Sequence, residues 1–325
     1  MKTLIRIVVV VALLLIAVIA GLIAFGTAQA PTSSALVAAF KGADYSSLPP
    51  LERYAAHDGA SLGYRRYPAK VPGSHVVVLI HGASDSGLAL HRLAESLQAT
   101  NVTSYVPEGR GHGSNLPRGD ITYIGQLEDD LAEFAAAVKK REPGSTLRLA
   151  GFSSGGGFAL KFAGSAQAGL FDRYLLLSPA LAYQGPIVRP KPAQPTAAIS
   201  FAVPYVPRLI GLGLANAVGV HAFDSLPVLA FAVPEDSKVL TRTYSLRLLN
   251  NLMPADYVGA IAAVARPMSV IIGDADEFSV AAEVAHAFAA AHPPIAVRIL
   301  PGVRHMGLVT DASALEAIDA WATAD

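Results

Sequence analysis

The chain contains no cysteine, which excludes disulfide bonds, thiolate zinc sites, iron–sulfur clusters and a cysteine nucleophile. Charged residues make up only 15% of the 325 residues, against about 25% in an ordinary soluble chain. The 25 Lys and Arg residues balance the 25 Asp and Glu residues, so no basic excess exists that would bind nucleic acid. Hydrophobic residues reach 52%, which excludes an intrinsically disordered chain.

The longest apolar run lies at the N-terminus. Lys2 and Arg6 precede 19 uninterrupted apolar residues, from Ile7 to Phe25, and at about 1.5 Å per residue this helix would nearly cross a hydrocarbon core of about 30 Å. That length favours a signal anchor, whereas Ala28-Gln-Ala30 is typical of a signal-peptide cleavage site. Both interpretations of residues 1–30 stay open. Because the positive charges precede the run, both predict an exported protein, either membrane-anchored with its catalytic domain outside the cytoplasm or secreted or periplasmic.

Strand and helix patterns alternate after residues 31–50, an Ala-, Ser- and Pro-rich stretch that is typical of a linker. The β-branched run His75–Ile80 predicts a strand buried on both faces. Apolar residues recur at helical spacing between Ile124 and Val138 and predict an amphipathic helix. Further strands are predicted at Glu52–His57, Ser61–Tyr67, Val102–Val106, Leu147–Ala150, Tyr174–Leu177, Met268–Ile272 and Ile295–Leu300. Further helices are predicted at Leu88–Leu97, Gly155–Ala168, Val280–Ala290 and Ala312–Ala322.

This alternation predicts an α/β fold with a mostly parallel, doubly wound sheet. The sheet and its helices would use residues 51–180 and 267–325. Residues 181–266 break the rhythm, since they are rich in Pro, Leu, Ala and Val and contain no clear strand–helix unit. A structureless loop of that length is uncommon in a compact domain, so the segment is predicted to be an inserted helical cap over the carboxyl edge of the sheet.

A glycine–serine motif follows one of the predicted strands. Gly151-Phe-Ser-Ser-Gly155 fits the pattern G-x-S-x-G between a strand and a helix, which is the context in which the motif presents a nucleophilic serine. The glycines remove Cβ atoms that would clash in a sharp turn, and the helix N-terminus favours a developing negative charge. Ser153 is therefore the candidate nucleophile. The alternative interpretation is a glycine–serine turn without chemistry.

A serine hydroxyl is a weak nucleophile that needs an imidazole base, and the base needs a carboxylate that fixes its tautomer. His305 lies on a loop after a late predicted strand, and the strand before that one runs into an acidic turn. In this turn Asp276 is the first candidate, Asp274 the second and Glu277 the third. The chain order Ser153, acid, His305 is typical of nucleophile-elbow hydrolases. Because the carboxyl ends of parallel strands meet at one edge of a sheet, we expect these side chains to converge.

The loop after the strand His75–Ile80 is the candidate source of hydrogen-bond donors for the negative charge that develops on the substrate carbonyl oxygen. Its backbone N–H at Ala83, together with that of Ser154, is predicted to form an oxyanion hole. His81 is predicted to orient this loop, and His112, in Arg110-Gly-His-Gly, is predicted to be a structural turn residue rather than a second base. The remaining histidines show no metal-ligand spacing, so neither a metal nor a cofactor is predicted.

The ordered set of motifs resembles the α/β-hydrolase fold family, and most closely its monoacylglycerol-lipase, lysophospholipase and serine-aminopeptidase-like members. The resemblance spans residues 50–325 and rests on five segments: His81-Gly, Arg110-Gly-His-Gly, Gly151-Phe-Ser-Ser-Gly, Gly273-Asp-Ala-Asp and Gly302-Val-Arg-His. It implies Ser153 as nucleophile, His305 as base, Asp276 as the residue that orients the base, and an oxyanion hole at Ala83 and Ser154.

The chain also departs from its relatives' patterns. Ala83 and Ser84 follow His81-Gly, unlike the extra glycines of HGGG-type esterases. Phe152 and Ser154 stand where the lipase-like elbow commonly has His and Met. The three triad positions match those of the family, but these differences weaken any inference from the family's substrates to the substrate of this chain.

The sequence therefore predicts a serine hydrolase that cleaves carboxylic esters through an acyl-enzyme. The apolar insertion and the N-terminal helix favour an acyl or lipid-like substrate near a membrane. A peptidase or an acyltransferase on the same triad is the alternative, and a peptidase would need a buried acid for the substrate amine. Candidates for that acid within the insertion are Asp224, Glu235, Asp236 and Asp256. A non-catalytic binding module that keeps the elbow as a scaffold is the third hypothesis.

Overall fold

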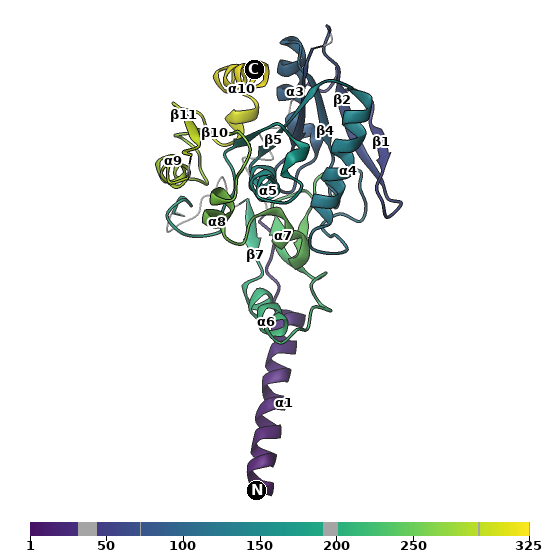
Figure 1. Cartoon of the computed structure of the whole chain (residues 1–325). Coiled ribbons are helices and arrows are strands. Elements are labelled where there is room, and N and C mark those ends of the chain that lie inside the picture. Colours follow the sequence, from purple (N-terminus) through teal and green to yellow (C-terminus); the bar gives the residue numbers. More distant parts are fainter. Residues whose placement is uncertain (32–43, 72, 191–200, 292, 325) are drawn as a thin grey trace.

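The computed structural model describes residues 1–31, 44–71, 73–190, 201–291 and 293–324. Most of the predicted linker at 31–50 lies outside the described residues. Figure 1 shows helix α1 (Lys2–Phe25) extending from the rest of the folded chain as a single rod, so the predicted N-terminal apolar helix is confirmed. Its side chains are largely exposed, and its length and composition are sufficient to cross a membrane.

The centre of the fold is an eight-stranded sheet in the order β1-β2-β4-β3-β5-β6-β10-β11. The strands are β1 (Glu52–Ala55), β2 (Ser61–Tyr67), β3 (His75–Ile80), β4 (Thr103–Pro107), β5 (Thr146–Phe152), β6 (Arg173–Leu177), β10 (Met268–Gly273) and β11 (Ala296–Leu300). The pairs β1–β2 and β2–β4 are antiparallel, whereas all other neighbours are parallel. The prediction of a mostly parallel α/β sheet is confirmed.

Helices cover both faces of this sheet, so each central strand is buried on two sides. On β3, Val76 and Val78 join one core cluster while Val77 and Leu79 join the other, and none is more than 1% exposed. One face carries α4 (Gln126–Arg141), α5 (Ser154–Ala163) and α9 (Ala281–Ala289), and the other carries α3 (His91–Ala99) and α10 (Ala312–Thr323). Short 3₁₀ turns lie at Gly87–Leu90, Ala168–Leu170 and Met306–Val309.

The segment 181–266, predicted as a helical cap, is mixed rather than helical. Its helices are α6 (Val206–Ala217), α7 (Leu246–Leu252) and α8 (Tyr257–Ala262). It also forms a second, antiparallel sheet of β7 (Ala202–Pro204), β8 (Pro227–Phe231) and β9 (Thr243–Ser245). These strands have only three to five residues and two of them contain proline, so the period-two alternation that identifies a strand is too short to see. Figure 1 shows α6, α7 and β7 between the main sheet and α1.

Candidate active site

Ser153 lies in a sharp turn between the end of β5 and the start of α5. Its backbone has φ 56° and ψ −118°, a strained conformation for a residue with a Cβ that costs about 1–3 kcal/mol. Hydrogen bonds hold it there, since Ser153 N donates to Leu177 O at 2.9 Å and Ala180 N donates to Ser153 O at 2.8 Å. Strain that the surroundings maintain is common at functional sites.

The two glycines of the motif are required by close backbone approach. A Cβ on Gly155 would lie 2.5 Å from the carbonyl oxygens of both Ile80 and His81, and one on Gly151 would lie 2.1 Å from Gly155 O. No side chain fits in such a space. The strand-to-helix turn that carries Ser153 therefore depends on glycine at both positions.

The carboxylate of Asp276 contacts the imidazole of His305. His305 Nδ1 and Asp276 Oδ2 are 2.7 Å apart, and both side chains are almost fully buried. Asp276 Oδ1 accepts backbone hydrogen bonds from Phe278 and Ser279, at 2.8 and 2.9 Å. Burial alone would raise the pKa of Asp276, but its electrostatic interaction and hydrogen bond with His305 and the hydrogen bond from Phe278 N outweigh it, so the pKa lies below its usual value.

Neither of the other candidate acids reaches the ring of His305. Asp274 Oδ1 accepts a hydrogen bond from Gly302 N at 2.7 Å and so joins the loops after β10 and β11. Glu277 accepts from the backbone N of His305 at 2.8 Å and pairs with Arg304. These two acids hold the loop that carries His305, whereas Asp276 contacts the ring itself.

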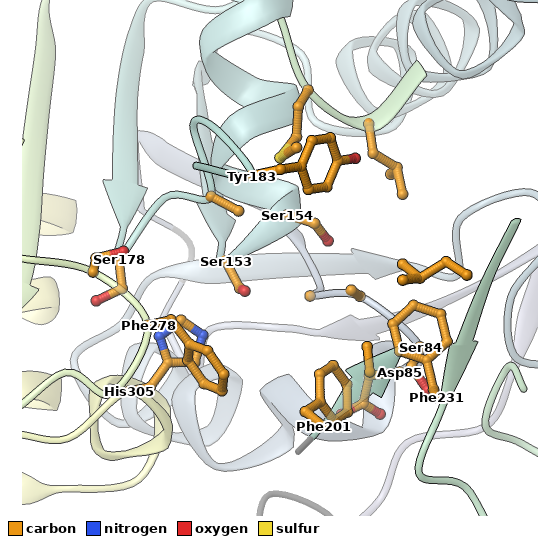
Figure 2. A pocket seen from close by; sticks show the side chains of 18 of the residues that line it. Ser84, Asp85, Ser153, Ser154, Ser178, Tyr183, Phe201, Phe231, Phe278 and His305 are labelled. Atoms are coloured by element: carbon orange, nitrogen blue, oxygen red, sulfur yellow. The ribbon is translucent and has the colours of Figure 1, made fainter. Parts of the chain in front are cut away.

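Two aromatic rings fix the plane of the imidazole. Phe278 meets His305 edge to face at a centroid distance of 4.8 Å, and Phe152 lies 4.9 Å away at a tilt. Figure 2 shows the hydroxyl of Ser153 and the ring of His305 projecting into the same part of a cavity. Within the described chain no hydrogen bond joins the two side chains. Such bonds are often long until a substrate is bound.

The backbone at Gly82 passes directly beside Ser153. A Cβ on Gly82 would lie 3.2 Å from the Cβ of Ser153, so the backbone just before Ala83 passes close to this serine. Ser154 is the first residue of α5, so its N–H has no acceptor within the helix. Both predicted oxyanion-hole residues line the same cavity as Ser153 and His305.

The following residue, Ser84, is held by the insertion. Its φ is 67°, its N–H donates to Tyr244 Oη at 2.6 Å, and its Oγ donates to Thr241 O at 2.8 Å. Thr241 N returns a bond to Ser84 O at 2.7 Å. The N–H of Ser84 is thus occupied, whereas the N–H of Ala83 has no hydrogen-bond acceptor among the residues that the structure describes. The sequence did not point to Tyr244, because it lies 160 residues from Ser84 along the chain.

His112 completes this chain of hydrogen bonds instead of facing the cavity. Its Nδ1 donates to Arg110 O at 3.0 Å, so its Nε2 accepts from Tyr244 Oη at 2.5 Å. Burial is the main reason that the pKa of His112 falls to about 3. His81 also uses both nitrogens on backbone, with Nδ1 donating to Gly82 O and Nε2 accepting from Gly109 N. In both rings one nitrogen donates and the other accepts, so both imidazoles are neutral and serve to hold the loops in place.

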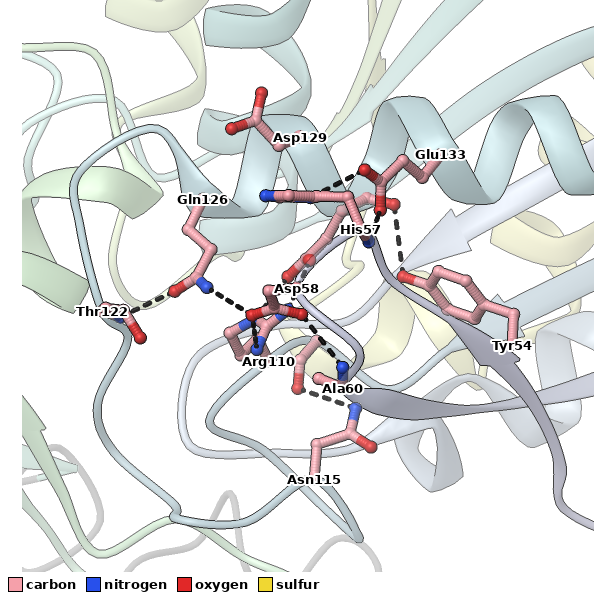
Figure 3. Close-up of polar contacts among 12 residues, drawn as sticks. Tyr54, His57, Asp58, Ala60, Arg110, Asn115, Thr122, Gln126, Asp129 and Glu133 are labelled. Atoms are coloured by element: carbon pink, nitrogen blue, oxygen red, sulfur yellow. Dashed lines mark hydrogen bonds and ion pairs between the residues drawn. The ribbon is translucent and has the colours of Figure 1, made fainter.

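An ion-pair network anchors the loop of His112 to the rest of the fold. Figure 3 shows Arg110 beside Asp58, which lies in the turn after β1. Arg110 also pairs with Asp130 on α4. The guanidinium binds Asp130 through two hydrogen bonds of 2.8 Å. The hydrogen bond to Asp130 is the largest of the effects that raise the pKa of Arg110. Two fixed carboxylates therefore set the position of the loop.

The first residues of the insertion form hydrogen bonds with the turn that carries Asp276. Arg189 Nε donates to Asp276 O at 2.6 Å, and Arg189 N donates to Phe278 O at 2.8 Å. Val280 N donates to Ile187 O at 2.9 Å. The insertion therefore contacts the turn of Asp276 through residues near its own start, and the loop of Ser84 through Thr241.

The cavity beside Ser153 has a volume of about 1090 Å³. Its walls are mostly apolar and come largely from the insertion, including Leu181, Ile187, Phe201, Leu209, Leu229, Phe231 and Met253. Asp85 also lines the cavity, and its carboxyl lies close to the apolar side chains of Phe201 and Phe231 (Figure 2). Burial raises the pKa of Asp85 to about 7. Across the described residues no cluster of three potential metal ligands occurs.

The four acids of the insertion that could bind a substrate amine lie elsewhere. Asp224 bonds Asn216 and His221, and Glu235 pairs with Arg242. The remaining two are Asp236 and Asp256, of which Asp256 caps α8. None of the four is among the described residues that line the cavity.

Comparison with solved structures shows the same fold in several lipases and esterases. Monoglyceride lipase from Saccharomyces cerevisiae, in complex with a substrate analogue, is similar with a TM-score of 0.62 and 18% identity over 85% of this chain and 95% of that one. Monoacylglycerol lipase from Paleococcus ferrophilus gives 0.59 and 17% identity over 80% and 97%. Est1E from Butyrivibrio proteoclasticus, with bound ferulic acid, gives 0.55 and 15% identity over 83% and 95%.

Sequence comparisons give a partial relative and a family. YnbC, an uncharacterised protein of Escherichia coli (strain K12), is 32% identical over 91 residues, which span 27% of this chain and only 16% of YnbC. A model of the family described as serine aminopeptidase, S33, matches residues 72–311, about three quarters of the chain. The chain therefore belongs to the serine aminopeptidase S33 family of α/β-hydrolases.

Proposed function

We propose that the protein is a serine hydrolase that cleaves carboxylic esters with an apolar acyl group. The observation that carries the proposal is the 2.7 Å contact between the Asp276 carboxylate and His305 Nδ1, next to a serine in a strained turn. Because Nδ1 donates to Asp276, the lone pair of Nε2 is free to accept a proton. A base in this tautomer is what a serine nucleophile requires.

In the proposed mechanism, His305 Nε2 takes the proton of Ser153 as its oxygen attacks the ester carbonyl carbon. The N–H groups of Ala83 and Ser154, with the N-terminus of α5, stabilise the resulting oxyanion. His305 then gives the proton to the departing alcohol, and the acyl group stays on Ser153. Water, activated by the same imidazole, attacks the acyl-enzyme and releases the acid.

The cavity indicates the class of substrate. A volume of about 1090 Å³ with apolar walls suits a long acyl chain, since such pockets bind apolar groups best. Two solved structures with this fold are lipases that act on monoglycerides by name. A monoacyl lipid ester is therefore the substrate class that we propose.

Substitution of the nucleophile tests the proposal. We expect Ser153→Ala to abolish both ester hydrolysis and labelling by a fluorophosphonate probe, with an unchanged circular dichroism spectrum. Ser114→Ala is the matched control, because this serine lies outside the cavity and its buried hydroxyl has no partner in the described part of the chain. Labelling of the Ser153→Ala variant would reject the nucleophile, and absence of labelling in the wild-type protein would favour a non-catalytic binding module.

A peptidase is the second candidate, and Asp85 is the observation that favours it. This carboxyl lies in the cavity, has no basic partner in the described part of the chain, and is able to pair with a substrate amine. A peptidase would hydrolyse aminoacyl p-nitroanilides, and Asp85→Asn would raise KM for them at least tenfold. An esterase with an apolar substrate would leave the anilides intact and tolerate Asp85→Asn.

For the location of the protein, we propose that α1 anchors it in a membrane with the hydrolase domain outside the cytoplasm. Lys2 and Arg6 precede the apolar part of α1 and would stay on the cytoplasmic side. Protease added to intact cells or spheroplasts should then remove the hydrolase domain. Protection of the domain until the membrane is opened would contradict this orientation.

A further inference from the structure

Helix α6 presents an apolar face to its surroundings. Val206, Ile210, Leu214 and Val218 recur every four residues and are 52%, 52%, 47% and 77% exposed. Val220 and Phe223 extend the same surface beyond the helix. A helix at the surface of a soluble domain normally carries charged residues on its outer face, and α6 carries none there.

The one charged residue of α6, Arg208, is buried and points at the end of α1. Its Nε donates to Ile23 O at 2.7 Å and its Nη2 donates to Ala24 O at 3.2 Å. These carbonyls belong to the last turn of α1, where no intrahelical donor remains and the helix dipole is negative. Removal of α1 would leave Arg208 with the carbonyl of Pro227 as its remaining acceptor. Arg208 therefore makes two of its three hydrogen bonds to α1.

Two glycines allow the helices to touch. A Cβ on Gly211 of α6 would lie 2.9 Å from side-chain atoms of Leu22 and Ile23, and a Cβ on Gly26 would lie 2.5 Å from the backbone N of Arg208. The backbones of α1 and α6 are thus in direct contact at the end of α1. Figure 1 shows α6 at this junction, between α1 and the rest of the folded chain.

The position of the junction along α1 matches the thickness of a bilayer. From Ile7, the first residue after Arg6, to Ile23, α1 has 17 residues, about 26 Å of helix, against a hydrocarbon core of about 30 Å. Helix α6 meets α1 at Leu22 and Ile23, and therefore lies where hydrocarbon gives way to headgroups. An apolar helix face at this depth is buried in the interface.

We propose that α1 and α6 form one membrane-binding unit, in which α1 spans the bilayer uncleaved and α6 lies in its outer interface. Val206 and Leu209 of α6 also line the cavity, so the helix that contacts lipid is a wall of the proposed acyl site. A lipid ester then reaches Ser153 from the outer leaflet without crossing water. This route rests on the proposed esterase function, whereas the membrane-binding unit does not.

Single introduced cysteines test how deeply α6 lies in the bilayer. The chain has no cysteine of its own, so no other site would carry the label. Ile210→Cys and Leu214→Cys, labelled with a nitroxide in the full chain and placed in phosphatidylcholine nanodiscs, should be accessible to oxygen and shielded from a water-soluble nickel reagent. Val71→Cys, whose native side chain is 63% exposed on the loop between β2 and β3, is the aqueous control. Nickel accessibility at 210 and 214 equal to that at 71 would overturn the proposal, as would loss of residues 1–30 from the mature protein. Self-crosslinking of the Ile210→Cys variant would assign the face to a second copy and overturn it as well.

Two ester substrates test the access route. In proteoliposomes, the double variant Ile210→Glu/Leu214→Glu should lower the ratio of bilayer-embedded monoacylglycerol hydrolysis to soluble short-chain ester hydrolysis at least tenfold. Val71→Glu should leave this ratio at the wild-type value. An unchanged ratio in the double variant would overturn the route. If the wild-type protein cleaves neither ester, the proposed function fails, and the nitroxide measurement still decides the membrane-binding unit.

Discussion

We expect Asp276→Asn to inactivate the protein without unfolding it, because the structure fixes how the new amide lies. Asp276 Oδ1 accepts hydrogen bonds from the backbone N–H groups of Phe278 and Ser279 at 2.8 and 2.9 Å. Only an oxygen accepts such bonds, so the amide NH₂ group takes the place of Oδ2, 2.7 Å from His305 Nδ1.

The consequence is the wrong tautomer of the base. The amide NH₂ donates, so Nδ1 of His305 must accept and the ring proton moves to Nε2. A protonated Nε2 cannot take the proton of Ser153. In a serine hydrolase this error lowers kcat by about 10⁴-fold, which corresponds to about 5.5 kcal/mol of transition-state stabilisation at 1.36 kcal/mol per tenfold. KM for a soluble p-nitrophenyl ester should stay close to the wild-type value, since the carboxylate does not touch the substrate.

Steady-state hydrolysis of this ester, with urea unfolding to check stability, measures the effect. Asp274→Asn is the matched control, because the amide oxygen still accepts from Gly302 N and the side chain does not contact His305. We expect the control to retain kcat within a few-fold. A kcat for Asp276→Asn above about a tenth of the wild-type value would refute the assignment of the tautomer.

Three further substitutions test the supports of the site. Tyr244→Phe leaves the N–H of Ser84 and Nε2 of His112 buried without partners, and urea unfolding should show a loss of about 2 kcal/mol or more; an equal stability would contradict these bonds. Gly155→Ala places a Cβ 2.5 Å from the carbonyl oxygen of His81, so stability should fall by about 3 kcal/mol and Tm by several degrees, and an unchanged Tm would count against the close approach. His112 has a pKa of about 3 when folded and about 6.5 when unfolded, so its contribution is complete above pH 6.5 and is lost as the pH falls towards 3. Between pH 7.5 and 5, His112→Gln should therefore lose about 2 kcal/mol less stability than the wild-type protein, and parallel losses would refute the buried neutral ring.

The elements that determine the main sheet were visible in the sequence, because local pattern determines them. The β-branched run of β3 and the glycines around Ser153 need only their neighbours to be interpreted. The helix after Ser153 was predicted to reach Ala168, but α5 ends at Ala163, where Gly164 follows. Glycine is a common helix terminator, and the prediction gave it too little weight.

Contacts between distant segments were not predictable from one sequence. Tyr244 and Arg208 lie in a region of weak periodicity, and their partners, Ser84 and Ile23, are 160 and 185 residues away. The choice among Asp274, Asp276 and Glu277 was also open in the sequence, since the three share one turn. Only the direction of each carboxylate shows which one contacts the base.

The insertion is fastened to the loops beneath it at two places, at Arg189 near its start and at Thr241, 25 residues before Arg266. If the whole segment swung away as a rigid flap, the backbone of the acid turn and the loop of Ser84 would lose these bonds together, and the reacting groups would lose their alignment. Opening must therefore come from flexing inside the insertion, with its two fastenings closed. The part of the insertion that would flex to admit substrate is therefore distinct from the two contacts that keep the reacting groups aligned.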